Sequence, residues 1–188
     1  MSRDADEDSG AGESDTATLP TRVAVTGTPG TGKSTATGLL EDEYTVIHLN
    51  DRITSDDDLW TERDAERDTL VADLDAVADA LGDWSGILDS HLAHRFDVDR
   101  VVVLRCHPEE IEKRLRNRGE SAATAVENSE SEALDVILSE AVAEHGAENV
   151  YEIDATDLDP EAVAEAVRDA IEGNREPSAG TVDFIDYL

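Results

Sequence analysis

Short apolar runs alternate along the chain with longer stretches in which apolar residues recur every three or four positions. The runs predict buried strands, because a strand that is covered on both faces is apolar throughout. They cover residues 23–26, 45–49, 86–89, 101–104 and 150–153. The recurring pattern predicts amphipathic helices. These cover residues 33–41, residues 68–81, a stretch opened by Pro108, residues 133–145, and a last helix begun by Asp159 and Pro160.

Strands that alternate with helices build a parallel sheet with helices on both faces. We therefore predict an α/β fold in one domain, since 188 residues are enough to bury one core. The domain spans residues 19–172. Residues 1–18 are mostly Asp, Glu, Ser, Ala and Gly, and we expect them to be disordered. Residues 173–188 form a tail with an apolar end that can dock on the body.

A glycine-rich turn lies between the first predicted strand and the first predicted helix. Residues 27–34, Gly-Thr-Pro-Gly-Thr-Gly-Lys-Ser, match the P-loop pattern G-x-x-x-x-G-K-[ST] in full. Glycines let the backbone curl so that successive N–H groups point at phosphate oxygens. Lys33 can reach the β- and γ-phosphates, and the Ser34 hydroxyl can join the ligand shell of Mg²⁺. The turn predicts a site for ATP with magnesium.

Polar side chains end the predicted strand at residues 86–89. A P-loop needs a carboxylate that holds Mg²⁺ through water, usually at the end of a neighbouring strand. Asp89 stands at such an end, and we interpret it as this carboxylate rather than as one surface acid among 46 Asp and Glu residues. His91 follows two positions later. For His91 a catalytic role and a structural role both remain open at this point.

Phosphoryl transfer also needs positive charge near the transferred group. In so acidic a chain, the arginines after the strand at residues 101–104 are candidates: Arg114, Arg116 and Arg118. Gly119 ends their helix, and the polar residues 120–132 are predicted to form a flexible lid. The alternative is a solvated helix end in which the cations favour the helix dipole. A second nucleotide could bind near three further arginines, Arg52, Arg63 and Arg67.

The formal net charge is −31 at pH 7. Such a chain repels itself at low ionic strength and loses this repulsion when salt screens it. We interpret the charge as halophilic adaptation to a salty cytoplasm, so the stability of the fold should rise in molar KCl. A merely acidic, soluble protein is the alternative. The charge also argues against strong direct binding to nucleic acid, because phosphates would be repelled.

The cysteine count and the lengths of the apolar runs concern the compartment. Cys106 is the single cysteine, which excludes an internal disulfide. No apolar run approaches the roughly 20 residues that cross a bilayer. The acidic N-terminus lacks the apolar segment of a secretory signal. We therefore expect a cytoplasmic protein without membrane contact.

Four segments taken together resemble one family. They are residues 26–35, Thr-Gly-Thr-Pro-Gly-Thr-Gly-Lys-Ser-Thr; residues 89–91, Asp-Ser-His; residues 114–119, Arg-Leu-Arg-Asn-Arg-Gly; and Glu127-Asn128 followed by residues 132–136, Glu-Ala-Leu-Asp-Val. This combination resembles the atypical adenylate kinases of archaea and eukaryotes, whose eukaryotic members are known as coilin-interacting nuclear ATPases. The resemblance runs over about residues 22–171.

The resemblance implies a P-loop NTPase fold like that of nucleoside monophosphate kinases. The monophosphate-binding segment would be about residues 50–73, and a short lid about residues 117–128. The implied activity is transfer of the γ-phosphoryl group of ATP to AMP or another nucleoside monophosphate, with ATPase activity beside it. The family also implies a role in late maturation of the small ribosomal subunit and its 16S rRNA, through a platform protein of that subunit. Two other functions stay open: an ATP-dependent ribosome assembly factor whose kinase activity is incidental, and a kinase of another small molecule.

The resemblance also assigns roles by position. The residues that bind ATP would be Gly30, Gly32, Lys33, Ser34, Thr35 and Arg118. Ser34 and Asp89 would hold Mg²⁺, partly through water, and the catalytic residues would be Lys33, Asp89, His91 and Arg118. The chain departs from the family at Glu120, where an aromatic residue is usual, and at Thr124 or Ala125, where the lid often carries a lysine. Residues 61–64 lack a glycine common in the monophosphate segment. These departures concern the lid and the acceptor rather than ATP binding.

Overall fold

The computed structural model describes residues 22–64 and 69–188, and the predicted disordered extension at residues 1–18 lies outside them. Five strands form one parallel sheet in the order β2-β5-β1-β6-β7. Their bounds are Arg22–Thr26 for β1, Val46–His48 for β2, Gly86–Asp89 for β5, Arg100–Arg105 for β6 and Val150–Asp154 for β7. The predicted α/β fold with a parallel sheet is confirmed. The strand order reverses at β1, because β2 and β5 lie on one side of it and β6 and β7 on the other. Open parallel sheets bind ligands at the carboxyl ends of the strands beside such a reversal.

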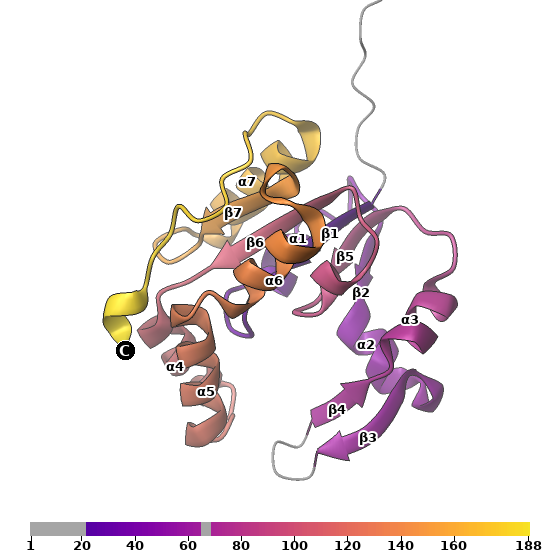
Figure 1. Cartoon of the computed structure of the whole chain (residues 1–188), viewed down its shortest axis with the longest axis horizontal. Helices are drawn as coiled ribbons and strands as arrows, with labels where there is room; N and C mark the ends of the chain where they lie inside the picture. The colour runs from indigo at the N-terminus through magenta and orange to yellow at the C-terminus, as the bar shows by residue number, and fades with distance from the viewer. Residues whose placement is uncertain (1–21, 65–68) are drawn as a thin grey trace, which may run out of the picture.

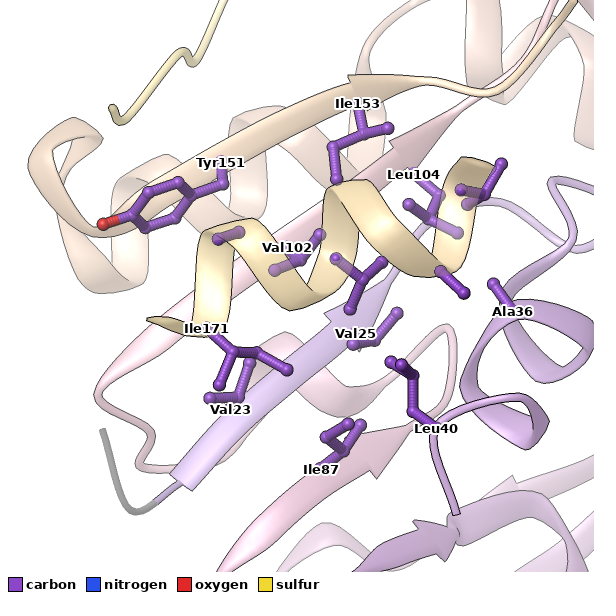
Figure 2. Close-up of a cluster of buried hydrophobic side chains, with 14 of the residues drawn as sticks. Val23, Val25, Ala36, Leu40, Ile87, Val102, Leu104, Tyr151, Ile153 and Ile171 are labelled. Carbon is purple, nitrogen blue, oxygen red and sulfur yellow. The ribbon is translucent and has the colours of Figure 1, made fainter. Parts of the chain in front are cut away.

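Helices cover both faces of the sheet (Figure 1). On one face, α1 (Lys33–Gly38) and α7 (Pro160–Glu172) pack over alternate side chains of the central strands. Figure 2 shows this layer, in which Val25, Val102 and Leu104 lie beneath α7. On the other face lie α2 (Leu49–Ser55), α3 (Leu74–Leu81) and α6 (Val136–His145). A strand buried on both sides must be apolar throughout, which explains the continuous run in β6.

Helix α7 begins and ends where its sequence predicts. The Asp159 side chain accepts a hydrogen bond from the Ala162 N–H at 2.8 Å, and Pro160 occupies the first turn. Gly173 follows the last turn with a φ of 78°, a conformation that glycine adopts without strain. Buried Val163, Val167 and Ile171 line the face that packs on the sheet, so the predicted periodicity is confirmed.

The predicted helix at residues 68–81 is wrong in its first part. Leu70 lies in strand β4 (Thr69–Ala72), which pairs antiparallel with β3 (Trp60–Asp64), and Asp68 lies outside the described residues. Helix α3 begins only at Leu74, because the Asp73 side chain caps it by accepting from the Ala76 N–H at 3.1 Å. Apolar residues four positions apart, such as Leu70 and Leu74, therefore need not share one helical face. The first can lie in a strand and the second in the helix that follows. The first helix is shorter than predicted as well, since α1 ends at Gly38.

The predicted flexible stretch at residues 120–132 is mostly helical. Helix α5 spans Ala122–Ala133, and the Ser121 side chain caps it by accepting from the Thr124 N–H at 3.0 Å. Small residues allow it to pack against α4 (Pro108–Asn117). The helix at residues 133–145 therefore begins later in the structure than the sequence pattern predicts. The chain turns at Asp135, which has a φ of 54°, and α6 begins at Val136.

The C-terminal tail contacts the body at several points. Ser178 donates its backbone N–H to the Val150 oxygen at 3.1 Å, and the Thr181 N–H donates to Glu152 Oε2 at 2.6 Å. The Phe184 ring meets His107 edge-on with 5.5 Å between ring centroids. Among the described residues, no helix is both long and apolar enough to span a membrane.

Candidate active site

The loop between β1 and α1 follows a path that requires glycine. Gly27, Gly30 and Gly32 have φ values of 137°, 98° and 101°. At Gly27 there is also no room for a side chain, because a Cβ atom would lie 2.3 Å from the Leu104 carbonyl oxygen of β6. The loop is therefore curled tightly against the end of the sheet, as the phosphate-binding pattern predicts.

Lys33 lies folded back over this loop. Its side chain is buried, and Nζ donates to the carbonyl oxygens of Gly27 at 2.6 Å and Thr28 at 3.1 Å. Burial lowers the pKa of Lys33 to about 8, although Asp89 and Glu132 oppose this effect and Arg118 adds to it. The amine is thus mostly in its charged ammonium form at pH 7. Neutral carbonyl oxygens hold it beside the loop, and an anionic phosphate can replace them as the acceptor.

Asp89 ends β5 beside both neighbouring strands. The parallel registers place it opposite Val25 of β1 and His48 of β2. Its Oδ2 accepts from His48 Nδ1 at 2.8 Å, whereas its Oδ1 is buried and is without a hydrogen-bond partner in the described part of the chain. A buried carboxylate oxygen without a partner is costly. The arrangement therefore fits a carboxylate that receives a ligand from outside the protein.

This carboxylate fits magnesium held mainly by a nucleotide. Ser34, exposed in the first turn of α1, lines the same cavity as Asp89. Within residues 22–64 and 69–188, no three His, Cys, Asp or Glu side chains gather into a metal cage. Mg²⁺ commonly uses one or two protein groups together with phosphates and water. One hydroxyl and one carboxylate oxygen are donors of the kind that it prefers.

His48 was not predicted as a site residue. Its Nε2 contacts Glu41 Oε1 at 3.0 Å, so both ring nitrogens face carboxylates. Burial opposes protonation of His48, but the hydrogen bonds to Glu41 and Asp89 outweigh it and raise the pKa. Only an indirect signal in the sequence pointed to His48, namely its place near the end of a predicted strand. Its contact with Asp89 depends on the pairing of that strand with β5, which only the fold reveals.

His91 lies in the turn after β5 and faces the same cavity. Burial lowers its pKa to about 4, with the charge of Lys33 and then His94 adding to the effect. The imidazole is therefore neutral at pH 7. It can donate one hydrogen bond and accept another, but it adds no positive charge.

Arg118 joins the site from the end of α4, where it closes the last turn of the helix. Arg114, one turn earlier, donates to the Gly30 oxygen at 3.2 Å and so ties α4 to the loop. Arg116 instead pairs with Glu112 at 2.6 Å. Of the three candidate arginines, Arg118 is the one that lines the cavity around Lys33 and Asp89.

The residues to which the resemblance assigns ATP-binding, Mg²⁺-binding or catalytic roles all line one cavity of about 140 Å³. Its lining is Pro29, Gly30, Gly32, Lys33, Ser34, Thr35, Asn50, Asp89, Ser90, His91 and Arg118. Asn50 and Ser90 were not predicted, and they contact each other through Ser90 Oγ and Asn50 Oδ1 at 2.9 Å. Asn50 comes from α2, so the segment predicted to bind the acceptor also reaches the P-loop.

A larger cavity of about 460 Å³ lies beside the first. Its lining includes Thr28 and His91 on the core, Leu70 on β4, and Thr124 and Asn128 on α5. The hairpin β3–β4 and the pair α4–α5 project from the same end of the molecule (Figure 1). Of the second group of arginines, Arg52 is exposed on α2, Arg63 lies on β3, and Arg67 lies outside the described residues.

Comparisons with known proteins indicate the family of this chain. A family model described as an AAA domain matches residues 23–135. A protein of Natronomonas pharaonis named "Putative adenylate kinase" is 61% identical over 168 residues, which cover 89% of this chain and 99% of the relative. Relatives of the same name are 55% identical over 169 residues in Halobacterium salinarum, covering 89% and 99%, and 40% identical over 171 residues in Archaeoglobus fulgidus, covering 88% and 93%.

A solved structure of a deoxyadenosine kinase from M. mycoides with bound dATP is a more distant likeness. It has a TM-score of 0.48 and 15% identity, and the match covers 79% of this chain and 97% of that chain. The curated relatives match over nearly their whole length and share one name. This chain therefore belongs to the AAA-domain family and to the archaeal adenylate-kinase-like family that these relatives represent.

Proposed function

We propose that this protein transfers the γ-phosphoryl group of ATP to AMP or another nucleoside monophosphate. The observation that supports this most directly is the convergence of Lys33, Asp89, His91 and Arg118 on one cavity beside the P-loop. The same cavity is reached by Asn50 from the predicted acceptor segment. The names of the relatives support the same class of reaction.

On the donor side, the residues of the P-loop grip the phosphates. The ammonium of Lys33 exchanges its contacts with the Gly27 and Thr28 oxygens for the β- and γ-phosphate oxygens. Arg118 adds a second positive charge from α4, where charge grows on the transferred group. Bound Mg²⁺, held by the Ser34 hydroxyl and, through water, by the buried Oδ1 of Asp89, would neutralise part of the phosphate charge.

On the acceptor side, the larger cavity gives room for a second nucleotide. It lies between the hairpin β3–β4, within the predicted acceptor segment at residues 50–73, and α5, which carries part of the predicted lid at residues 117–128. Its volume of about 460 Å³ suits a small-molecule ligand. No general base is required, because the acceptor phosphate is already anionic. His91 lines both cavities and, being neutral, can orient the acceptor by a hydrogen bond.

Formation of ADP, measured with and without AMP in molar KCl, tests this proposal. A monophosphate kinase forms ADP from both substrates, so the rate should depend strongly on AMP. Other nucleoside monophosphates and unrelated hydroxyl acceptors, offered in parallel, define the acceptor class. An unchanged rate of ATP hydrolysis with every acceptor would contradict the proposal.

The same assay separates a second candidate function. The net charge of −31 makes the surface attractive to a basic partner. We therefore keep the proposal of an ATPase in late maturation of the small ribosomal subunit, acting on a basic platform protein. Hydrolysis that rises only when such a protein is added, with no effect of AMP, would favour this function over the kinase.

The affinity for ATP should fall as the pH rises through about 8. The pKa of Lys33 in the folded protein is about 8, against an ordinary value of 10.5, so its charge is lost early in the titration. A neutral amine attracts phosphate less strongly than an ammonium. Between about pH 8 and 10.5 the Lys33 amine is mostly neutral in the folded protein and mostly protonated in the unfolded chain. The contribution of Lys33 to the free energy of unfolding therefore rises with pH across that range.

Calorimetric titration of ATP at pH 7, 8 and 9 measures this dependence. The variant Lys33→Arg keeps its charge throughout, so any affinity that it retains should not fall over the same range. An affinity of the unmodified protein that stays constant from pH 7 to 9 would show that Lys33 remains charged there.

A further inference from the structure

A buried carboxylate joins the end of helix α5 to the phosphate-binding loop. Glu132 is 3% exposed and stands in the last turn of α5. Its Oε1 accepts from Arg105 Nε at 2.7 Å and from the Cys106 N–H at 3.1 Å. Its Oε2 accepts from the Thr28 hydroxyl at 2.5 Å. One oxygen therefore binds strand β6 and the segment after it, and the other binds the P-loop.

The contact with Thr28 bears on Lys33. Thr28 is 2% exposed, and its carbonyl oxygen accepts from Lys33 Nζ at 3.1 Å, from the Thr31 N–H at 3.2 Å and from the Thr31 hydroxyl at 2.9 Å. Any displacement of Thr28 would therefore move an acceptor of the lysine and the turn inside the loop. Glu132 also acts on Lys33 through its charge, which favours the ammonium form.

Pairing with Arg105 does not by itself explain this geometry. The Arg105 guanidinium also contacts the carboxylates of Asp135, at 2.5 Å, and of Glu152. Three acids thus surround one cation, and neutralising Arg105 does not require all of them. Oε2 of Glu132 takes no part in the contacts with Arg105 side-chain nitrogens and instead meets the loop.

We propose that Glu132 is a positioning residue for the phosphate-binding loop. Through the Thr28 hydroxyl it holds the loop in its curled form, and through the Thr28 carbonyl oxygen it sets the place of the Lys33 ammonium. Because Glu132 lies on α5, the link also ties this helix to the nucleotide site. The inference rests on the proposed function, in that the loop is taken to bind ATP.

Thr28→Val tests the link with little change of shape. Valine keeps the volume of threonine and removes the hydroxyl, while the contacts of Glu132 with Arg105 and Cys106 remain. Hydrogen bonds to charged groups are among the stronger ones, so we expect the dissociation constant for ATP to rise about tenfold. Thr28→Ser restores the donor and should bind ATP within about twofold of the unmodified protein.

The matched control is Thr181→Val in the C-terminal tail. The Thr181 hydroxyl also donates to a buried glutamate, Glu152 Oε2 at 3.1 Å, which is connected to the loop only indirectly, through Arg105 and Glu132. A purely structural role for Thr28 would lower the melting temperature, as we expect for the control, and leave ATP affinity unchanged. Calorimetry with ATP and thermal unfolding, both in molar KCl, measure the two quantities separately.

The outcomes distinguish the inference from the proposed function. If the unmodified protein binds no ATP, the proposed function fails whatever the variants do. If it binds ATP and Thr28→Val binds equally well, the positioning role of Glu132 is overturned. Should Thr28→Val fail to fold, Glu132→Gln replaces it, since Asp135 and Glu152 still face Arg105. A carboxamide oxygen is a weaker acceptor, so we expect a rise of about threefold, and an unchanged dissociation constant would again overturn the role.

Discussion

Replacement of Lys33 by methionine is expected to lower the rate of ADP formation from ATP and AMP at least about a hundredfold. Methionine has a similar length but no charge, so it fills most of the space of the lysine and removes the cation that reaches the phosphates. Lys33 is buried beside the Gly27 and Thr28 oxygens, where no other lysine can replace it. A coupled assay of ADP formation at saturating ATP measures the effect.

Lys113→Met is the matched control, because Lys113 is the other lysine of the chain. It is exposed on α4 and pairs with Glu110 at 3.1 Å. Its loss should leave the rate within about twofold, since exposed ion pairs contribute little. Full activity of Lys33→Met, with an unchanged melting temperature, would remove the P-loop lysine from the mechanism.

Replacement of Arg105 by methionine is expected to lower the free energy of unfolding by about 3–5 kcal/mol. Arg105 is 1% exposed, and it neutralises Glu132 and Glu152, which are buried, together with the half-buried Asp135. Without the guanidinium, two buried carboxylates would lie close together with no cation between them. Urea unfolding in molar KCl measures the change.

The control for this variant is Arg168→Met on the surface of α7. Arg168 pairs with Glu43 at 2.6 Å, and both side chains are partly exposed. Removal of such an exposed pair should change the free energy of unfolding little. A loss no larger than that of Arg168→Met would show that the buried acids do not depend on Arg105.

The tail would share in the effect of the Arg105 variant. Glu152 holds Arg105 with one carboxylate oxygen and accepts from the backbone N–H groups of Thr181, at 2.6 Å, and Val182, at 3.1 Å, with the other. The Arg105 guanidinium also lies over the Phe184 ring, with 5.5 Å between Arg105 Cζ and the ring centroid. The tail is therefore packed against the same buried charges that Glu132 connects to the P-loop.

The features that could be predicted from sequence depend on neighbours along the chain. The P-loop is eight consecutive residues. Its glycines specify the shape of the loop, and its lysine and serine specify the chemistry of phosphate and Mg²⁺ binding. The strands of a buried parallel sheet are uninterrupted apolar runs, and β6 was recognised for that reason. Helix α7 carries its own capping residue, Asp159, so its start was predicted correctly.

The hairpin β3–β4 and helix α5 show where such patterns become ambiguous. Leu70 and Leu74 are four residues apart, which suits one helical face equally well as a strand followed by a helix. Helix α5 is rich in polar and small residues, so its pattern resembled a loop. It is helical because Ala125 can pack closely against Ile111 and Leu115 of α4, a contact that local periodicity does not reveal.

The sequence was therefore sufficient for the fold class and for the local phosphate-binding motif, because short-range geometry and continuous apolar runs encode both. The contacts of Asp89 with His48, of Glu132 with Thr28, and of Arg105 with Glu152 became visible only in the folded chain. Their partners lie 41, 104 and 47 residues apart. Side chains this distant in sequence meet only when strand order and helix packing bring them together, and the local sequence pattern specifies neither.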